Sequence, residues 1–134
     1  MATISQRALG ITDMPDKEQA EHRGRNRLVT DDEVGDALRW LATNARDLGE
    51  ARARMAKATH MIKHTEALLY LASLEKTVDA KKASVRASQR WLDAINDEAD
   101  ATGEFEKMRA LREAAMARID CWRTESASMR GAKS

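Results

Sequence analysis

The chain has 134 residues and a mass of 15.0 kDa, which is room for a single domain. It has one Pro and six Gly, and 34% of its residues are charged while only 4% are aromatic. A β-sandwich or β-barrel would need more aromatic and β-branched residues and more turn signals, so the composition argues against both classes. It is typical of long exposed helices, and the fold class that we expect is all-α.

Membrane and secretory classes are also disfavoured. No apolar run approaches the roughly 18–20 residues that cross a bilayer, and the first residues, MATISQRALG, lack the basic-then-apolar pattern of a secretory signal. The single cysteine, Cys121, rules out a disulfide framework within the chain. We therefore expect a soluble cytoplasmic protein that does not contact a membrane.

The first predicted element is a flexible segment, residues 1–29, which holds Gly10, Pro15 and Gly24 and shows no sustained apolar period. A capping box, Thr30 to Glu33, then predicts a helix from Asp31 to about Glu75. Its first apolar row, spaced by seven residues, consists of Val34, Leu41, Leu48, Met55, Ile62 and Leu69. The companion row, three residues before the later members, starts apolar and turns polar, and it consists of Leu38, Ala45, Arg52, Thr59 and Glu66.

A short helix or frayed connector is expected from Thr77 to Arg86, with Thr77 as its cap. A second long helix is predicted from near Ser88, with fraying past Arg123 and a flexible tail over residues 126–134. Its predicted core row is Trp91 or Leu92, Ile95, Ala99, Thr102, Phe105, Met108, Leu111, Ala115, Ile119 and Trp122. The period of this row shifts by one position near Gly103, which predicts a local distortion there.

The two long helices are expected to pair as a coiled-coil-like antiparallel hairpin over residues 30–125. A hairpin buries only one seam, and large apolar side chains left in water forgo about 1.5–3 kcal/mol each. We therefore expect a homo-oligomer. The predicted interface residues are Trp40, Met61, Leu68, Leu71, Ile119 and Trp122. The alternative is a lone hairpin whose N-terminal segment folds back over this flank.

Charge is distributed unevenly along the chain. Residues 1–50 carry a net charge of −3, residues 51–90 carry +6, and residues 91–134 carry −2. The basic stretch also contains Tyr70 and is followed by Trp91, and both have rings on which a base could stack. This pattern predicts a nucleic-acid-binding surface, although a solvated helix face would show the same charges. The candidate residues are Arg54, Lys57, Lys63, Lys76, Lys81, Lys82, Arg86 and Arg90. Arg23, Arg25 and Arg27 form a second candidate, whose alternative is a disordered tail.

Catalytic and metal sites are not indicated. His60 and His64 share a helix face, but neither a third ligand nor the glutamate of a zinc protease accompanies them. Cys121 lacks an activating cluster and is expected to be a partly buried structural thiol. The acidic residues Asp97, Glu98 and Asp100 fall on a polar helix face. We expect no enzymatic activity and no cofactor.

Two stretches carry a resemblance, namely EALLYLASLEKT at residues 66–77 and RALREAAMARIDCWRTESASMR at residues 109–130. Across residues 39–130, the chain resembles small helical proteins of tailed phages and, more distantly, the UvsY recombination mediators of T-even-type phages. The resemblance implies an oligomer that binds single-stranded DNA coated by a single-strand-binding protein and helps to load a recombinase. It also implies that residues 52–90 form the DNA surface, and that the protein works in the host cytoplasm.

Two hypotheses thus follow from the sequence. The first is a phage-type recombination accessory protein that binds single-stranded DNA as a homo-oligomer, with a recombinase or a single-strand-binding protein as a further partner. The second is a helical protein-interaction or assembly factor, such as a scaffold, a chaperone or an inhibitor of a host protein, without affinity for nucleic acid.

Overall fold

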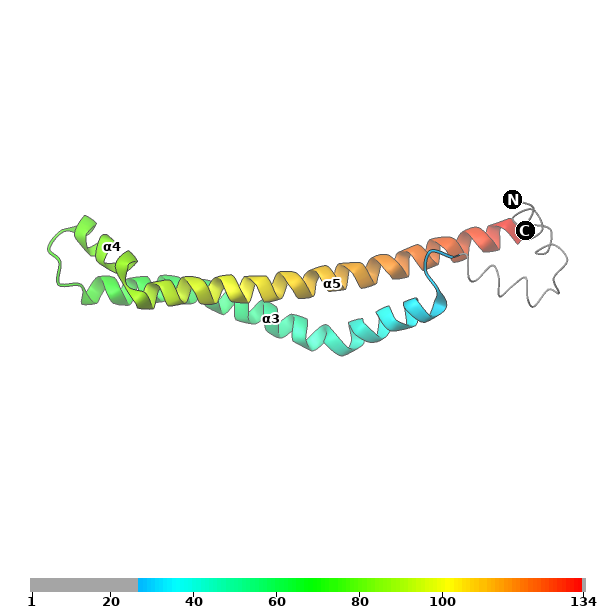
Figure 1. Cartoon of the computed structure of the whole chain (residues 1–134), viewed down its shortest axis with the longest axis horizontal. Helices are drawn as coiled ribbons and strands as arrows, with labels where there is room; N and C mark the ends of the chain where they lie inside the picture. Colours follow the sequence, from blue (N-terminus) through cyan, green and yellow to red (C-terminus); the bar gives the residue numbers. More distant parts are fainter. Residues whose placement is uncertain (1–26, 134) are drawn as a thin grey trace, which may run out of the picture. The chain divides into compact units, whose positions relative to one another are not determined.

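The computed structural model describes residues 27–133, in which all regular secondary structure is helical (Figure 1). The helices are α3 (Asp31–Ala72), α4 (Val78–Ala87) and α5 (Gln89–Lys133). Helices α3 and α5 pack antiparallel to each other, as Figure 1 shows, so the expected fold class and the pairing of two long helices are confirmed. The predicted flexible segment, residues 1–29, lies outside the described residues except for its last three. No helix in the described range is long and apolar enough to span a bilayer.

The predicted starts of α3 and α4 are confirmed at their capping residues. The hydroxyl of Thr30 accepts a hydrogen bond of 3.2 Å from the backbone N–H of Glu33, and α3 begins at Asp31, the residue after Thr30. The hydroxyl of Thr77 accepts one of 3.1 Å from the backbone N–H of Ala80 and caps α4. Each cap satisfies a backbone donor that the first helical turn leaves unpaired.

The helix ends differ more from the prediction. Helix α3 ends at Ala72 rather than near Glu75, and the Ser73 hydroxyl accepts a hydrogen bond of 3.3 Å from the Glu75 N–H in the turn that follows. Helix α5 runs unbroken through Gly103 to Lys133, beyond the predicted onset of fraying at Arg123.

The described chain divides into two compact units. The first comprises residues 27–40 and 115–133, and the second comprises residues 41–114. Both units contain a stretch of α3 and a stretch of α5, and only the second contains α4.

The core of residues 41–114 is built on small side chains. Ala51, Ala58 and Thr65 are buried at seven-residue spacing on α3, and Ala101 and Met108 are buried at the same spacing on α5. An ion pair of 3.3 Å joins Arg54 on α3 to Asp97 on α5 and marks the register of the two helices. In an antiparallel pair, this register places Ala51 at about the level of Ala101. Small residues at such a seam allow two helix backbones to approach closely.

The predicted companion row on α3 was wrong by one residue. Its members Leu38, Ala45, Arg52, Thr59 and Glu66 are all exposed, whereas the positions immediately before Arg52, Thr59 and Glu66 are buried. The phase shift at Gly103 is also absent from the burial pattern. One row on α5 is buried or half-buried at every seventh residue, and it consists of Ala94, Ala101, Met108, Ala115, Trp122 and Met129. Alanine occupies half of this α5 row, and at those positions a bulkier side chain would force the helices apart.

Residues 27–40 and 115–133 are joined by side-chain hydrogen bonds between distant parts of the sequence. The indole N–H of Trp122 donates to Asp31 at 2.7 Å, and the backbone N–H of Leu28 donates to Glu125 at 3.0 Å. The Arg27 guanidinium donates to Ser126 at 3.4 Å and to the sulfur of Met129 at 2.9 Å. These contacts with residues 122–129 provide a physical reason for α5 to continue past Arg123.

The small-residue seam leads to a prediction for Ala101→Leu. Ala101 is 0% exposed, so three added carbon atoms overpack the contact with α3, and we expect the free energy of unfolding to fall by about 1–3 kcal/mol. Urea unfolding followed by circular dichroism measures this change. The matched control is Ala99→Leu, because Ala99 is exposed on the same helix. Equal effects of the two substitutions would contradict the seam.

Candidate nucleic-acid interface

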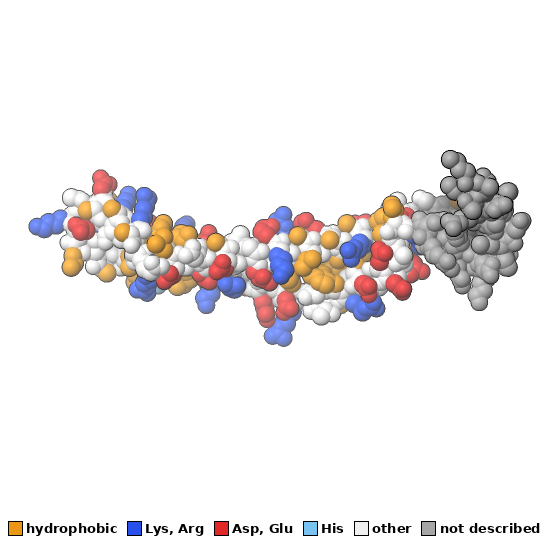
Figure 2. All heavy atoms as spheres, in the orientation of Figure 1, with side chains coloured by type: hydrophobic (Ala, Val, Ile, Leu, Met, Phe, Trp, Pro, Cys, Tyr) orange, Lys and Arg blue, Asp and Glu red, His pale blue; other side chains and the backbone are white. Residues whose placement is uncertain are grey.

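The basic surface consists of cations from the second half of α3, the turn after it, α4 and the start of α5. Its members are Lys57, Lys63, Lys76, Lys81, Lys82, Arg86 and Arg90. All seven belong to the unit of residues 41–114, and all except the half-buried Lys81 are exposed. Figure 2 shows basic side chains around the α4 end of this unit, at the left, beside apolar groups. The structure thus brings most of the predicted candidates to one end of the unit.

Ion pairing separates Arg54 from the other candidates. Arg54 pairs with Asp97 at 3.3 Å, so its charge is partly neutralised within the chain. Across residues 27–133, none of the seven cations of the basic surface lies within ion-pair distance of an acidic side chain. Other arginines are paired along their own helix, such as Arg46 with Glu50 at 3.0 Å and Arg109 with Glu113 at 3.3 Å. Unpaired cations are the ones that remain free to neutralise phosphates.

Helix α4 positions the lysines that follow the turn. Val85 is its buried residue, and Lys81 lies one helical turn earlier on the same face. Lys81 is therefore half-buried, and its Nζ lies 5.2 Å from the centroid of the Tyr70 ring on α3. This distance is within the range of a cation–π interaction. The contact joins α4 to the end of α3 and leaves Lys82 exposed beside it.

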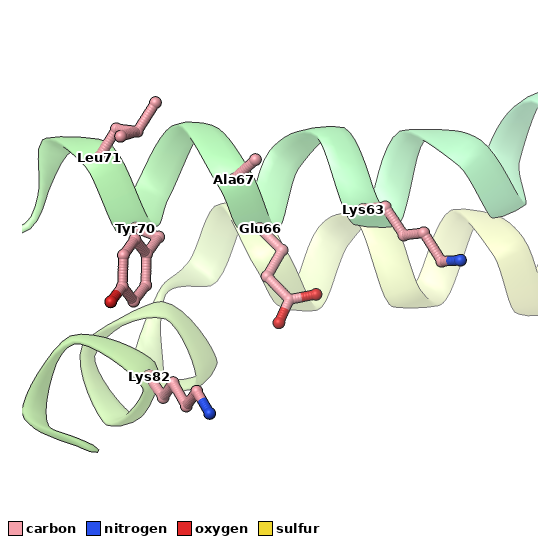
Figure 3. Close-up of a pocket in the computed structure, with 6 residues that line it drawn as sticks. All are labelled: Lys63, Glu66, Ala67, Tyr70, Leu71 and Lys82. Carbon is pink, nitrogen blue, oxygen red and sulfur yellow. The ribbon is translucent and has the colours of Figure 1, made fainter. Parts of the chain in front are cut away.

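An open cavity of about 410 Å³ lies between α3 and α4 (Figure 3). Its lining residues are Lys63, Glu66, Ala67, Tyr70, Leu71 and Lys82. In Figure 3, Tyr70 and Glu66 extend from α3 on the side where α4 lies, and Lys82 extends from α4. The cavity therefore combines an aromatic ring, a carboxylate and two ammonium groups.

The sequence predicted part of this cavity and missed the rest. Lys63 and Lys82 are predicted nucleic-acid contacts, Tyr70 is a predicted stacking ring and Leu71 is a predicted interface residue. The sequence places Glu66 only in a helix row, and Ala67 has no predicted role. A signal for these two residues is present in the sequence. Glu66 and Ala67 lie three or four residues after Lys63 and before Tyr70, and this spacing places all four on one face of α3. The second predicted ring, Trp91, is half-buried, and its indole N–H is enclosed without an acceptor among the described residues.

The predicted oligomer interface divides into exposed and half-buried residues. Met61, Leu68 and Leu71 on α3 are exposed, and Leu71 retains 80% of its accessible surface. Trp40, Ile119 and Trp122 are half-buried, and Trp122 is engaged within the chain through Asp31. The exposed apolar side chains on α3 remain accessible to a second chain.

The second basic candidate and the two histidines do not belong to the basic surface. Arg23 and Arg25 lie outside the described residues, and Arg27 contacts Asp31, Ser126 and Met129 within the chain. His60 and His64 are exposed. Within the part of the chain that the structure describes, no group of three or more His, Cys, Asp or Glu residues could hold a metal ion.

Cys121 is a free, half-buried thiol on α5. Partial removal from water raises the pKa of the Cys121 thiol above its ordinary value, and the negative charge of Glu125 raises it further. The thiol also donates a hydrogen bond of 3.6 Å to Glu125, which favours the protonated form. This environment is the opposite of that of an activated nucleophile.

Comparison with known proteins identified no relative. No protein-family model, curated protein sequence or solved structure matches this chain.

The environment of Cys121 leads to a prediction for its alkylation by iodoacetamide. Because the raised pKa lowers the thiolate fraction, we expect the rate to rise with pH at a higher midpoint than for a free cysteine. Glu125→Gln removes the charge, so the midpoint should move to lower pH. Asp120→Asn is the control, since Asp120 pairs with Arg123 at 3.8 Å. A profile that is the same in all three proteins would contradict the role of Glu125.

Proposed function

We propose that the protein binds single-stranded DNA through the basic surface. The observation that carries this proposal is the group of seven cations without acidic partners among the described residues, two of which, Lys63 and Lys82, line an open cavity together with Tyr70. Lysine and arginine neutralise phosphates and release the counterions bound to the strand. Residues 51–90 supply this charge with nine basic and only three acidic residues.

The presence of Tyr70 favours a single strand over a duplex. Bases in a duplex are stacked on one another, whereas those of a single strand can stack on an aromatic side chain. The Tyr70 ring lines the cavity beside Lys63 and Lys82, so a base on the ring would have phosphates of its own strand near these ammonium groups.

The biological role that we propose is that of an accessory protein in phage-type recombination. The sequence resemblance to UvsY mediators supports this role, with a recombinase or a single-strand-binding protein as the further partner. Exposed Met61, Leu68 and Leu71 support assembly as a homo-oligomer. An oligomer would repeat the basic surface once per subunit, which raises affinity for a long strand through multivalency.

A second candidate function is a protein-interaction or assembly factor. It is favoured by Leu74, which is 98% exposed in the turn after α3, close in sequence to the exposed Leu71 and Val78. Exposed apolar groups of this kind mark contact sites for other proteins.

The DNA-binding proposal is tested by a quadruple variant, Lys81→Gln, Lys82→Gln, Arg86→Gln and Arg90→Gln. Fluorescence anisotropy with labelled single-stranded and double-stranded oligonucleotides should show salt-sensitive, single-strand-preferring binding by the unmodified chain. Because each lost phosphate contact lowers the slope of log affinity against log salt by about 0.7, the variant should lose up to about 3 in slope.

The matched control for this experiment removes four arginines that have acidic partners. These substitutions are Arg39→Gln, Arg46→Gln, Arg109→Gln and Arg123→Gln. Both variants change the net charge equally, so a specific surface predicts a large loss only in the first. Equal losses, or no binding at low salt, would contradict the proposal. If the chain binds no DNA but captures a defined protein partner in a pull-down, the second candidate function is favoured.

The oligomer is tested by sedimentation velocity at micromolar concentration. We expect the unmodified chain to sediment above its monomer mass of 15.0 kDa. Met61→Glu with Leu68→Glu should yield the monomer, because two charges would enter the apolar interface. Ala53→Glu with Ala56→Glu is the control at exposed positions of the same helix. An unmodified chain that sediments as a monomer would overturn this part of the proposal.

A further inference from the structure

The cavity between α3 and α4 contains more than a phosphate site requires. Lysines alone are sufficient to bind the phosphate backbone of a strand, and such contacts do not distinguish one base sequence from another. The lining also includes the ring of Tyr70 and the carboxylate of Glu66, four residues apart on α3. These two groups offer a stacking surface and a hydrogen-bond acceptor side by side.

The face of the Tyr70 ring is already in contact with a cation from its own chain. The ammonium of Lys81 lies 5.2 Å from the ring centroid. Lys81 lies on α4 and has a long, flexible side chain, so a stacked base can displace its ammonium from the ring without moving the helix. The displaced ammonium remains beside the strand, where it can contact a phosphate.

Glu66 is the polar group of the cavity that a polyanion site does not explain. Its carboxylate forms no hydrogen bond or ion pair with any residue between 27 and 133. Placed among the cations of the basic surface, a carboxylate repels phosphates and weakens binding to the backbone. The same carboxylate accepts hydrogen bonds at both oxygens, so it suits a ligand that presents donors.

Among the four bases, guanine matches this acceptor best. Its ring N–H and its amino group are adjacent donors that point the same way, so they can meet both oxygens of one carboxylate. Cytosine and adenine each place one amino donor beside a ring nitrogen acceptor, and thymine places its single N–H between two carbonyls. A carboxylate faces repulsion from those acceptors, whereas guanine presents only donors to it.

We infer that this cavity receives one unstacked base of the bound strand and prefers guanine. The base stacks on Tyr70, its donors bond to Glu66, and Lys63 and Lys82 contact the flanking phosphates. The volume of about 410 Å³ is in the range of small-ligand sites. This inference rests on the proposed binding of single-stranded DNA and adds a base preference to it.

The test uses ten-nucleotide strands of thymidine that differ at one central position. One strand carries guanine there, one carries an abasic sugar, and one carries thymidine throughout, so all three have the same phosphates. Anisotropy titrations at constant salt should show that guanine binds roughly five- to tenfold more tightly than thymidine. The abasic strand should bind more weakly than both, because it cannot stack on Tyr70.

Two variants connect this preference to the cavity. Glu66→Gln should abolish the advantage of guanine without weakening binding to the thymidine strand. Tyr70→Leu should reduce the difference between thymidine and abasic strands while leaving the salt slope unchanged. Glu75→Gln is the matched control, since Glu75 is an exposed acid of the basic stretch outside the cavity lining, and it should keep the preference. Circular dichroism verifies that each variant is folded.

The outcomes distinguish this inference from the proposed function. Equal, salt-sensitive affinity for all three strands would overturn the base site and leave the DNA-binding surface in place. A guanine preference that survives Glu66→Gln would overturn the role of the carboxylate. Absence of binding to every strand at low salt would overturn both the inference and the proposed function.

Discussion

In residues 41–114, α3 and α5 meet along buried alanines, and this contact decides where the larger side chains lie. Ala51 and Ala58 face the α5 row that contains Ala101, so at these alanine positions the seam has no space for a leucine or a methionine. The large apolar residues of α3, such as Met55 and Ile62, consequently flank the seam and stay half-buried. Others, including Met61 and Leu68, are exposed. A narrow seam therefore produces an apolar surface outside it.

Helix α4 likewise buries few side chains. This helix of 10 residues buries one side chain, Val85, and Lys81 approaches Tyr70 on α3. Because so little of α4 is buried, its lysines stay accessible and a cavity remains between it and α3. A better-packed helix would fill the cavity and draw Lys81 and Lys82 into a hydrophobic contact.

Local signals in the sequence were sufficient for the fold, and the details that they missed have physical reasons. Thr30 and Thr77 are identifiable as caps from the sequence because each precedes an acidic first turn, and the capping hydrogen bond joins residues only three positions apart. The seam was misplaced by one position because a search for large apolar residues overlooks Ala51 and Ala58, and alanine occurs equally often on exposed faces. Glu66 could not be placed in a cavity from the sequence, since that cavity exists only through the angle at which α4 folds back.

The contacts of the structure close loops of very different length. The capping bond at Thr77 closes over three residues, the Arg54–Asp97 pair over 43, and the bond between Trp122 and Asp31 over 91. Loop closure becomes costlier with length, by about 0.6 kcal/mol per doubling, and contacts between distant residues slow folding. The contacts around the turn that contains α4 therefore close at the lowest entropic cost. Of these three contacts, the bond between Trp122 and Asp31 therefore carries the largest loop-closure cost.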